Sequence, residues 1–335
     1  MPTLAVYHAS CVPEAIIGQI ASAPWGAAQY LAELLRSGQL TALCGHRTRL
    51  LILHERGRLC AFLTLAKMDE IRDTPLTPWA GFVFTFPSDR HHRYAGRLLQ
   101  AAESIAAMEG TSTLYISTDA DGLYEHFGYA FSHTDNNLHG EVCRIYAKSL
   151  MPSQDTPELA FLMPACLEEA DREWQFIRDL PKDENGFLNT WEGCDRDTFL
   201  TSALPEMLAH AKGHRLPEGY VPCTSFFLWS GPRIAGLFRL RHHLTPALQE
   251  GAGHIGYTVH PDFRGKGYGT VGLRRLITLA PDIIPEDTLR LRCYLSNPAS
   301  LHVMLHNGAQ LLRQDDETCF TAIPISDVWS EKTCT

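Results

Sequence analysis

A glycine-rich segment around residue 265 contains the residues best suited to chemistry. Residues 257–259 have the character of a β-strand that ends before Pro261, and glycines at 265, 267 and 269 lead into a helix-like run. Glycines allow tight turns that direct several backbone N–H groups at one point, and a helix N-terminus adds unpaired amides and a partial positive charge. Because Arg264 and Lys266 supply further positive charge, the segment predicts a loop that binds a diphosphate.

The segment departs from two common phosphate-binding loops. A Walker loop needs Ser or Thr directly after Gly-Lys, whereas Gly267 follows Lys266 in this chain. The dinucleotide fingerprint needs a glycine at the position that Thr270 occupies. A flexible glycine-rich turn that binds nothing is the alternative interpretation of these residues.

The same residues resemble the coenzyme A loop of GNAT acetyltransferases, Arg/Gln-x-x-Gly-x-Gly/Ala, through Arg264, Gly267 and Gly269. Nearly all of residues 160–323 is similar to a family of bacterial predicted GNAT acetyltransferases, including the segments 183–187, 216–222 and 253–257. The resemblance implies a sheet whose fourth and fifth strands splay apart, with acyl-CoA in the gap. It also implies the binding residues: Arg264, Gly265, Lys266, Gly267, Tyr268, Gly269 and Thr270 for the pyrophosphate, the backbone around Thr258 and Val259 for the pantetheine arm, and Asn297 and Ser300 near the thiol.

The first half resembles the same family less closely, over roughly residues 40–147. Its loop follows Pro87 at the same spacing and reads Arg90-His91-His92-Arg93-Tyr94-Ala95, so Arg93 replaces the central glycine. A side chain there is costly if the position needs a positive φ; alternatively, Arg93 itself contacts a phosphate. Tyr124 lies four residues before the Gly128-Tyr129 pair, and the resemblance implies that it protonates the departing thiolate. Four further residues resemble a segment of one GNAT subgroup: Asp69, Arg72, Pro78 and Trp79.

Acyl transfer to an amine requires an unprotonated amine, so a base or a water relay must accept a proton near pH 7. His254 lies on the strand that leads into the loop, and an unperturbed histidine titrates near this pH. We therefore predict His254 as the base of the second half, with a hydrogen-bonded structural histidine as the alternative. Cys293 and Tyr294, on the facing strand, are expected as wall residues. Met304 stands where the second half would carry its tyrosine.

The surrounding elements repeat in the two halves of the 335 residues. The first half predicts strands at 50–53, 59–65, 79–86 and 113–117 with a helix at 94–108; the second predicts strands at 225–229, 234–240, 254–259 and 289–295 with a helix at 269–279. Strands followed by helices indicate mixed α/β sheets. A polar, proline-containing stretch at 149–158 separates the halves. The predicted fold is therefore two tandem GNAT-like domains, residues 1–150 and 159–335, each a splayed mixed sheet flanked by helices.

Composition narrows the class of protein. The net charge of −9 argues against nucleic acid as a partner, and no apolar run approaches the ~20 residues of a membrane helix. Ten cysteines without a Cys-x-x-Cys pair are typical of reduced thiols in a cytoplasmic protein. No metal site is predicted, because His302 and His306 have ligand spacing but no evident third ligand.

The sequence thus predicts an acyl-CoA N-acyltransferase that moves an acetyl group from acetyl-CoA directly to a primary amine of a small molecule, peptide or protein. Two alternatives stay open. One is a CoA-binding pseudoenzyme or regulatory module; the other places catalysis in the N-terminal domain, with Tyr124 as the general acid. The acceptor, the acyl-chain preference and the oligomeric state do not follow from the sequence.

Overall fold

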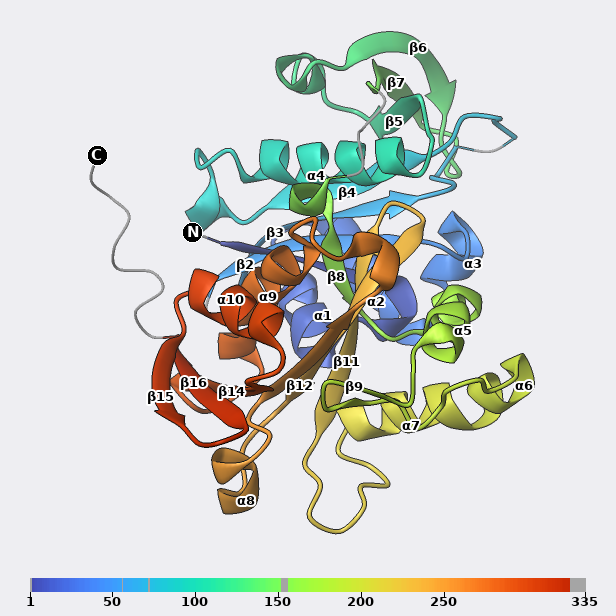
Figure 1. Ribbon diagram of the computed structural model, residues 1–335. Helices are drawn as coiled ribbons and strands as arrows, with labels where there is room; N and C mark the ends of the chain where they lie inside the picture. Colours follow the sequence, from blue (N-terminus) through green and yellow to red (C-terminus); the bar gives the residue numbers. More distant parts are fainter. Residues whose placement is uncertain (1, 56, 72, 152–155, 326–335) are drawn as a thin grey trace. The chain divides into compact units, whose positions relative to one another are not determined.

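The computed structural model describes residues 2–55, 57–71, 73–151 and 156–325 (Figure 1). The chain divides into two compact units, one of residues Pro2–Leu159 and one that begins at Ala160. Part of the stretch in which the sequence predicts the domain boundary, residues 152–155, lies outside the described residues.

The first unit contains a seven-stranded sheet in the order β1-β2-β3-β4-β5-β7-β6. Its strands are β1 (Thr3–His8), β2 (Arg49–Glu55), β3 (Arg58–Ala66), β4 (Trp79–Thr85), β5 (Thr113–Thr118), β6 (Ala130–Asn136) and β7 (Val142–Ser149). Neighbours are antiparallel except β4 and β5, which are parallel and share a single pair, Trp79 with Tyr115. The sheet therefore opens between these two strands beyond that pair.

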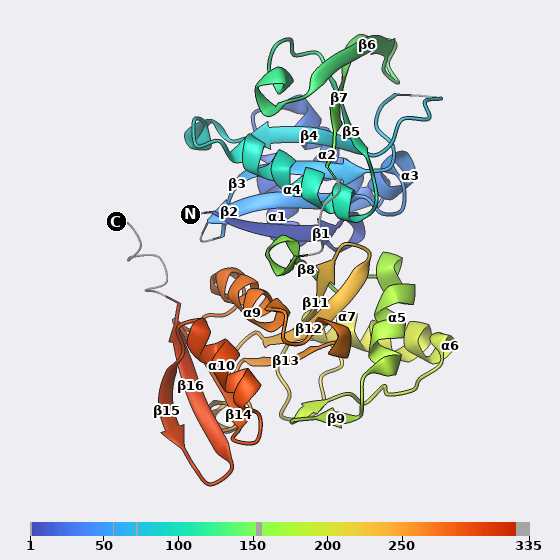
Figure 2. The same cartoon turned by 45° about the horizontal axis from the view of Figure 1, so that its top comes forward.

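Helices cover both faces of the first sheet. Helix α4 (Tyr94–Met108) packs on β2, β3 and β4, whereas α1 (Glu14–Ala21) and α2 (Gly26–Ser37) lie on the other face (Figures 1 and 2). A short helix, α3 (Leu40–Cys44), follows α2. Apolar residues at helical spacing explain the packing of α4, since its buried side chains fall on one face: Leu98, Leu99, Ala102, Ile105 and Ala106.

The second unit has the same strand order, but its sheet is in two pieces. The first piece is β13-β12-β11-β8 and the second is β14-β16-β15. The bounds are β8 (Phe161–Pro164), β11 (Cys223–Ser230), β12 (Arg233–Arg241), β13 (Ile255–Val259), β14 (Thr288–Tyr294), β15 (Gln310–Gln314) and β16 (Thr318–Pro324). A separate hairpin is formed by β9 (Asp183–Glu184) and β10 (Phe187–Leu188).

The larger piece of this sheet lies between helices. On one face Phe238 of β12 fills the space beside Gly272 of α9 (Tyr268–Leu279), so close that a Cβ atom on this glycine would lie 2.2 Å from the ring. On the other face the ring of Phe227 packs edge-on against the ring of Phe176 of α5 (Ala170–Asp179), with the ring centres 5.9 Å apart. The remaining helices are α6 (Arg196–Thr198), α7 (Leu204–Ala211), α8 (Pro246–Glu250) and α10 (Pro298–His306).

The strands and helices that the sequence predicts around the loops at 90–96 and 264–270 are present, and their first or last residues differ slightly from the predicted ones. Helix α4 has the predicted bounds, and α9 begins one residue before the predicted start. Both units are mixed α/β, with splayed sheets and flanking helices, which confirms the predicted fold class. Among the residues described, none of the helices combines the length and the apolar character needed to span a bilayer.

Candidate functional site

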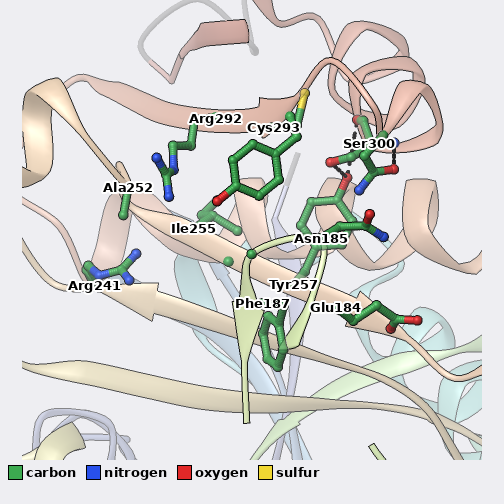
Figure 3. A pocket seen from close by; sticks show the side chains of 14 residues that line it. Glu184, Asn185, Phe187, Arg241, Ala252, Ile255, Tyr257, Arg292, Cys293 and Ser300 are labelled. Atoms are coloured by element: carbon green, nitrogen blue, oxygen red, sulfur yellow. Dashed lines mark hydrogen bonds between the residues drawn. The ribbon is translucent and has the colours of Figure 1, made fainter. Parts of the chain in front are cut away.

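The gap between β13 and β14 in the second unit holds a cavity of about 620 Å³ of empty space, part of it open to solvent (Figure 3). Both strands contribute its walls, and the β9–β10 hairpin closes one side. The lining residues are Glu184, Asn185, Gly186, Phe187, Arg241, Ala252, Ile255, Gly256, Tyr257, Arg292, Cys293, Tyr294, Asn297 and Ser300. The opening in the sheet thus leaves a cavity between its strands.

His254 joins the two pieces of the sheet at the closed end of the gap. Its backbone N–H donates to the Arg290 carbonyl at 2.7 Å, and the Arg290 N–H donates to its Nδ1 at 3.0 Å. The neighbouring Gly253 has φ +66°, and a Cβ atom there would lie 2.3 Å from the same carbonyl oxygen. The strands can approach this closely only because position 253 has no side chain.

This placement bears on the predicted role of His254 as a base. The ring is fully buried and lies outside the cavity wall. Because Nδ1 accepts a hydrogen bond, Nε2 carries the proton of the neutral ring, and it lies 3.4 Å from Oε2 of Glu286. Burial lowers the pKa of the ring against the opposing effect of Glu286. In this tautomer Nδ1 accepts from the backbone, and Nε2 faces Glu286 without forming a hydrogen bond among the described residues. The arrangement favours the alternative prediction, a structural histidine, over a base.

The hairpin turn is fitted against β14. Asp183 accepts a hydrogen bond from the Gly186 N–H at 2.9 Å, which holds the turn. Gly186 has φ +84°, and a Cβ atom there would lie 2.8 Å from the ring of Tyr294. Below the turn, the Arg239 guanidinium lies 4.6 Å from the centre of the Phe187 ring. A glycine is therefore required where the hairpin meets the cavity wall.

The glycine-rich loop follows β13 as predicted. Gly265 has φ +69° and Gly267 has φ 92°, ψ −5°, so both take the left-handed conformation that favours glycine. Helix α9 starts at Tyr268, and no side chain caps its N-terminus. The first N–H groups of the helix lack helical acceptors. Together with the positive end of the helix dipole, they form a site suited to an anion.

Arg264 connects this loop to the hairpin. Its Nε donates to the Val259 carbonyl at 2.9 Å, and its Nη2 lies 2.7 Å from both carboxylate oxygens of Glu184. The Thr258 hydroxyl also donates to Glu184, at 3.1 Å. Lys266 donates to the Asp262 carbonyl at 2.6 Å. The charge of the one carboxylate in the cavity wall is therefore balanced by the arginine of the loop.

Hydroxyl groups lie at the α10 side of the cavity. The Tyr257 hydroxyl is 2.9 Å from Oγ of Ser300, and Asn297 caps α10 by accepting from the Ser300 N–H at 3.2 Å. Burial raises the pKa of Tyr257 to about 12 and that of Cys293 to about 11. Both groups are therefore protonated at neutral pH and can donate hydrogen bonds to a ligand.

The structure brings most of the predicted site residues to one place. Asn297 and Ser300 line the cavity, as do the expected wall residues Cys293 and Tyr294, and the loop follows directly from Thr258 and Val259. Met304, at the position that corresponds to the family's tyrosine, is buried, and its sulfur accepts a hydrogen bond from the Thr321 hydroxyl. Arg292 and Ala252 carry no local signal in the sequence, because only the three-dimensional arrangement of β13 and β14 shows that they face the gap.

The loop of the first unit has nearly the same backbone as the glycine-rich loop. His91 has φ 69° where Gly265 has 69°, and Arg93 has φ 60°, ψ 26° where Gly267 has 92° and −5°. Arg93 directly precedes α4, as Gly267 precedes α9. The central position does need a positive φ, and Arg93 adopts it. Left-handed backbone costs roughly 1–2 kcal/mol for a residue with a side chain, so the loop is formed with strain.

Acidic and phenolic groups surround the opening in the first sheet. Phe82 has φ 49°, at a bulge in β4, and a Cβ atom on the preceding Gly81 would lie 3.5 Å from both carboxylate oxygens of Asp69. Burial raises the pKa of Asp69 to about 6. Tyr124 is buried, and its pKa is raised to about 12 by burial and then by the charge of Asp69. Phe127, in the same turn as Tyr124, packs on Gly96 of α4.

Comparison with known proteins bears on the second unit. A model of the acetyltransferase (GNAT) domain matches residues 161–310. This part of the chain belongs to the GNAT superfamily. The match spans β8 to the start of β15, so it includes the hairpin, the loop and every lining residue of the cavity. We therefore refer to this part as the GNAT unit. A search of curated proteins found no match.

Several solved structures match parts of the chain. A putative GNAT acetyltransferase from Desulfovibrio desulfuricans has 13% identity and a TM-score of 0.36, with 44% of this chain and 100% of that chain covered. An aminoglycoside 6'-N-acetyltransferase complexed with coenzyme A has 15% identity and a TM-score of 0.35, covering 45% and 99%. An acyl-CoA N-acyltransferase from Pseudomonas aeruginosa has 18% identity and a TM-score of 0.34, covering 44% and 99%. The family assignment rests on the domain model.

Proposed function

We propose that the GNAT unit transfers an acetyl group from acetyl-CoA to a primary amine. The observation that carries the proposal is the glycine-rich loop at Arg264–Thr270, which continues the strand that forms one wall of the gap and leads into the uncapped N-terminus of α9. A diphosphate at the loop and a thioester in the gap would be held by consecutive parts of one chain segment. Family membership over residues 161–310 supports the same reaction class.

In this proposal the residues mainly position the two substrates. The N–H groups of the loop and of the first turn of α9 bind the diphosphate, and the backbone near Thr258 and Val259 accompanies the pantetheine arm. The amine nitrogen attacks the thioester carbonyl, a C–N bond forms, and the C–S bond breaks. The nitrogen loses one proton to water, and the thiolate gains one. Tyr257, paired with Ser300 and protonated at neutral pH, is the group we assign to donate toward the thiolate.

Release of CoA thiol from acetyl-CoA in the presence of a panel of primary amines tests this function. We expect amine-dependent release that Gly267→Asp reduces by at least tenfold, because a negative charge then faces the diphosphate. Gly308→Asp is the matched control, since Gly308 also has a positive φ of +83° but lies after α10 and has open space around it. Binding of acetyl-CoA without turnover of any amine would instead favour a CoA-binding regulatory module.

A second candidate site in the first unit is favoured by one observation, the carboxylate of Asp69 beside the sheet opening near Tyr124. With a pKa of about 6, Asp69 is deprotonated at neutral pH and can accept a proton from an amine, while Tyr124 can protonate a thiolate. The strand order and the loop backbone match those of the GNAT unit. On these grounds we propose that the first unit is a second GNAT-like domain.

Parallel substitutions separate the two sites. If turnover belongs to the GNAT unit, Gly267→Asp abolishes thiol release and Tyr124→Phe leaves it unchanged. If turnover belongs to the first unit, Tyr124→Phe lowers kcat and Gly267→Asp has little effect. Partial losses in both single variants, with complete loss in the double variant, would show that both units are active.

A further inference from the structure

We propose that the acceptor amine of the GNAT unit carries an oxyanion, a carboxylate or a phosphate, which Arg241 and Arg292 bind on the hairpin side of the gap. The inference rests on the proposed acetyl transfer and adds the class of acceptor. Both arginines line the cavity, one from each piece of the divided sheet.

The two arginines lie on the face of the sheet opposite α9. Side chains alternate along a strand, so Arg241 points away from the face on which Phe238 meets α9. Arg292 shares its face of β14 with Tyr294, whose ring packs on Gly186 of the hairpin. Figure 3 shows Arg241 and Arg292 at one end of the cavity beside Ala252, with Glu184 and Ser300 at the other end.

This end of the cavity is available to the second substrate. The loop at the end of β13 and the hydroxyl pair at α10 define the side proposed for acetyl-CoA. An amine that attacks the thioester must approach from the remaining end, where the two arginines lie. The acceptor would therefore meet the arginines while its nitrogen reaches the gap.

The charges at this end are not balanced within the protein. Among the residues that the structure describes, no carboxylate contacts the guanidinium of Arg241 or Arg292; Arg241 donates to the Gly253 carbonyl at 3.0 Å, and Arg292 lies 5.6 Å from the centre of the Tyr294 ring. The cavity's own carboxylate, Glu184, is held by Arg264. The chain as a whole has a net charge of −9, but this end of the cavity is locally positive. It is therefore complementary to an anionic ligand.

Arginine is suited to this role because its planar guanidinium binds carboxylate and phosphate oxygens with two parallel hydrogen bonds. A third arginine, Arg239, adds to the positive field from the same face of β12. Its pKa is lowered by burial and also by the charge of Arg241. An incoming oxyanion would relieve this repulsion as well as pair with Arg241 and Arg292.

Matched acceptors test the inference. Each primary amine is tested in three matched forms, which carry a carboxylate, a neutral carboxamide or a phosphate at the same position. The release of CoA thiol is measured at saturating acetyl-CoA. We expect kcat/KM to be higher for at least one anionic form than for the amide by about 10- to 100-fold, the range for a hydrogen bond to a charged group. The carboxylate and phosphate arms distinguish the two oxyanions.

Variants assign the preference to the arginines. Arg292→Gln should lower kcat/KM for the anionic form by about 10-fold more than kcat/KM for the neutral amide. Arg241→Lys tests the second contact while keeping a donor near the Gly253 carbonyl. Arg196→Gln is the control, because Arg196 is exposed and paired with Asp171 on the surface at 2.6 Å. Thermal unfolding of each variant checks that the fold is retained.

Two outcomes would overturn the inference. One is equal or better turnover of the neutral amides by the wild-type protein, and the other is an equal loss for neutral and anionic acceptors in Arg292→Gln. If no amine is acetylated, the proposed function fails, and calorimetry then decides the inference separately. N-acetylated carboxylates and phosphates should bind the wild-type protein in the presence of CoA and bind Arg292→Gln at least tenfold more weakly; no binding to the wild type would contradict it.

Discussion

Two titratable residues, Asp69 and His254, lie beside the openings of the two sheets. Burial acts on both by favouring the neutral form, so the pKa of Asp69 rises to about 6 and that of His254 falls below its ordinary value. Their consequences differ. The pKa of Asp69 lies close enough to 7 for the carboxyl group to exchange protons near neutral pH. In His254, Nδ1 accepts from the Arg290 N–H, and Nε2 lies 3.4 Å from Glu286 without a hydrogen bond among the described residues.

His254→Asn should alter how stability depends on pH. The pKa of His254 is lower in the folded state than in the unfolded state, where it is near 6.5. The neutral ring therefore contributes to the free energy of unfolding above pH 6.5, and this contribution is lost as the pH falls through the folded-state pKa. Asparagine can still accept from the Arg290 N–H but cannot titrate. Urea unfolding from pH 7.5 to 5 should therefore show a smaller decline in the free energy of unfolding for His254→Asn. A steeper decline than in the wild type would contradict this account.

Asp69→Asn should stabilise the first unit at pH 7 while lowering any activity that it has. The folded-state pKa is raised from 3.8 to about 6, so the penalty for the ionised form develops as the pH rises through this window. Removing the charge should increase the free energy of unfolding by up to about 3 kcal/mol at pH 7 and by little at pH 3.5. Denaturant titrations at the two pH values measure the difference. Equal effects at both would rule out titration as the cause.

At the scale of elements, the divided sheet of the GNAT unit depends on the junction at Gly253. A side chain there would meet the Arg290 backbone, which cannot move aside without opening β13 from β14. Gly253→Ala should lower the free energy of unfolding by about 2–4 kcal/mol, the sum of overpacking and left-handed strain. Gly219 has φ +79° with open space around it, so Gly219→Ala should lower the free energy of unfolding only by the left-handed strain. Equal urea midpoints for the two variants would show that the contact does not matter.

Some elements of the fold can be predicted from the sequence, and others cannot. The spacing of Gly265, Gly267 and Gly269 predicts the loop, and apolar periodicity predicts α4 and α9, because these signals are local. The packing of the hairpin turn on Tyr294 and the gap-facing side of Arg292 depend on contacts between distant segments. Whether Arg93 takes a positive φ could not be decided from the sequence, since an arginine disfavours this conformation and only the surrounding fold imposes it.

For the whole molecule, the two loops predict two binding sites for acetyl-CoA in one chain. Calorimetric titration should give a stoichiometry of two for the wild type and for Gly308→Asp, and one for Gly267→Asp. A ligand at 100 times its dissociation constant stabilises the unit that binds it by about 2.7 kcal/mol. Thermal unfolding should therefore show two ligand-dependent transitions in the wild type. A stoichiometry of one in the wild type would restrict the cofactor to a single unit.

The missing strand pairing between β13 and β14 leaves two strand edges facing each other across the GNAT unit's cavity. Backbone groups on such edges have no neighbouring strand to pair with, and they exchange their hydrogens with solvent faster than those inside a sheet. A pantetheine chain, with amides of its own, would lie between the edges in the manner of an additional strand. Deuterium uptake along Ile255–Val259 should slow when acetyl-CoA is added, whereas the interior of β12 should be protected from the outset.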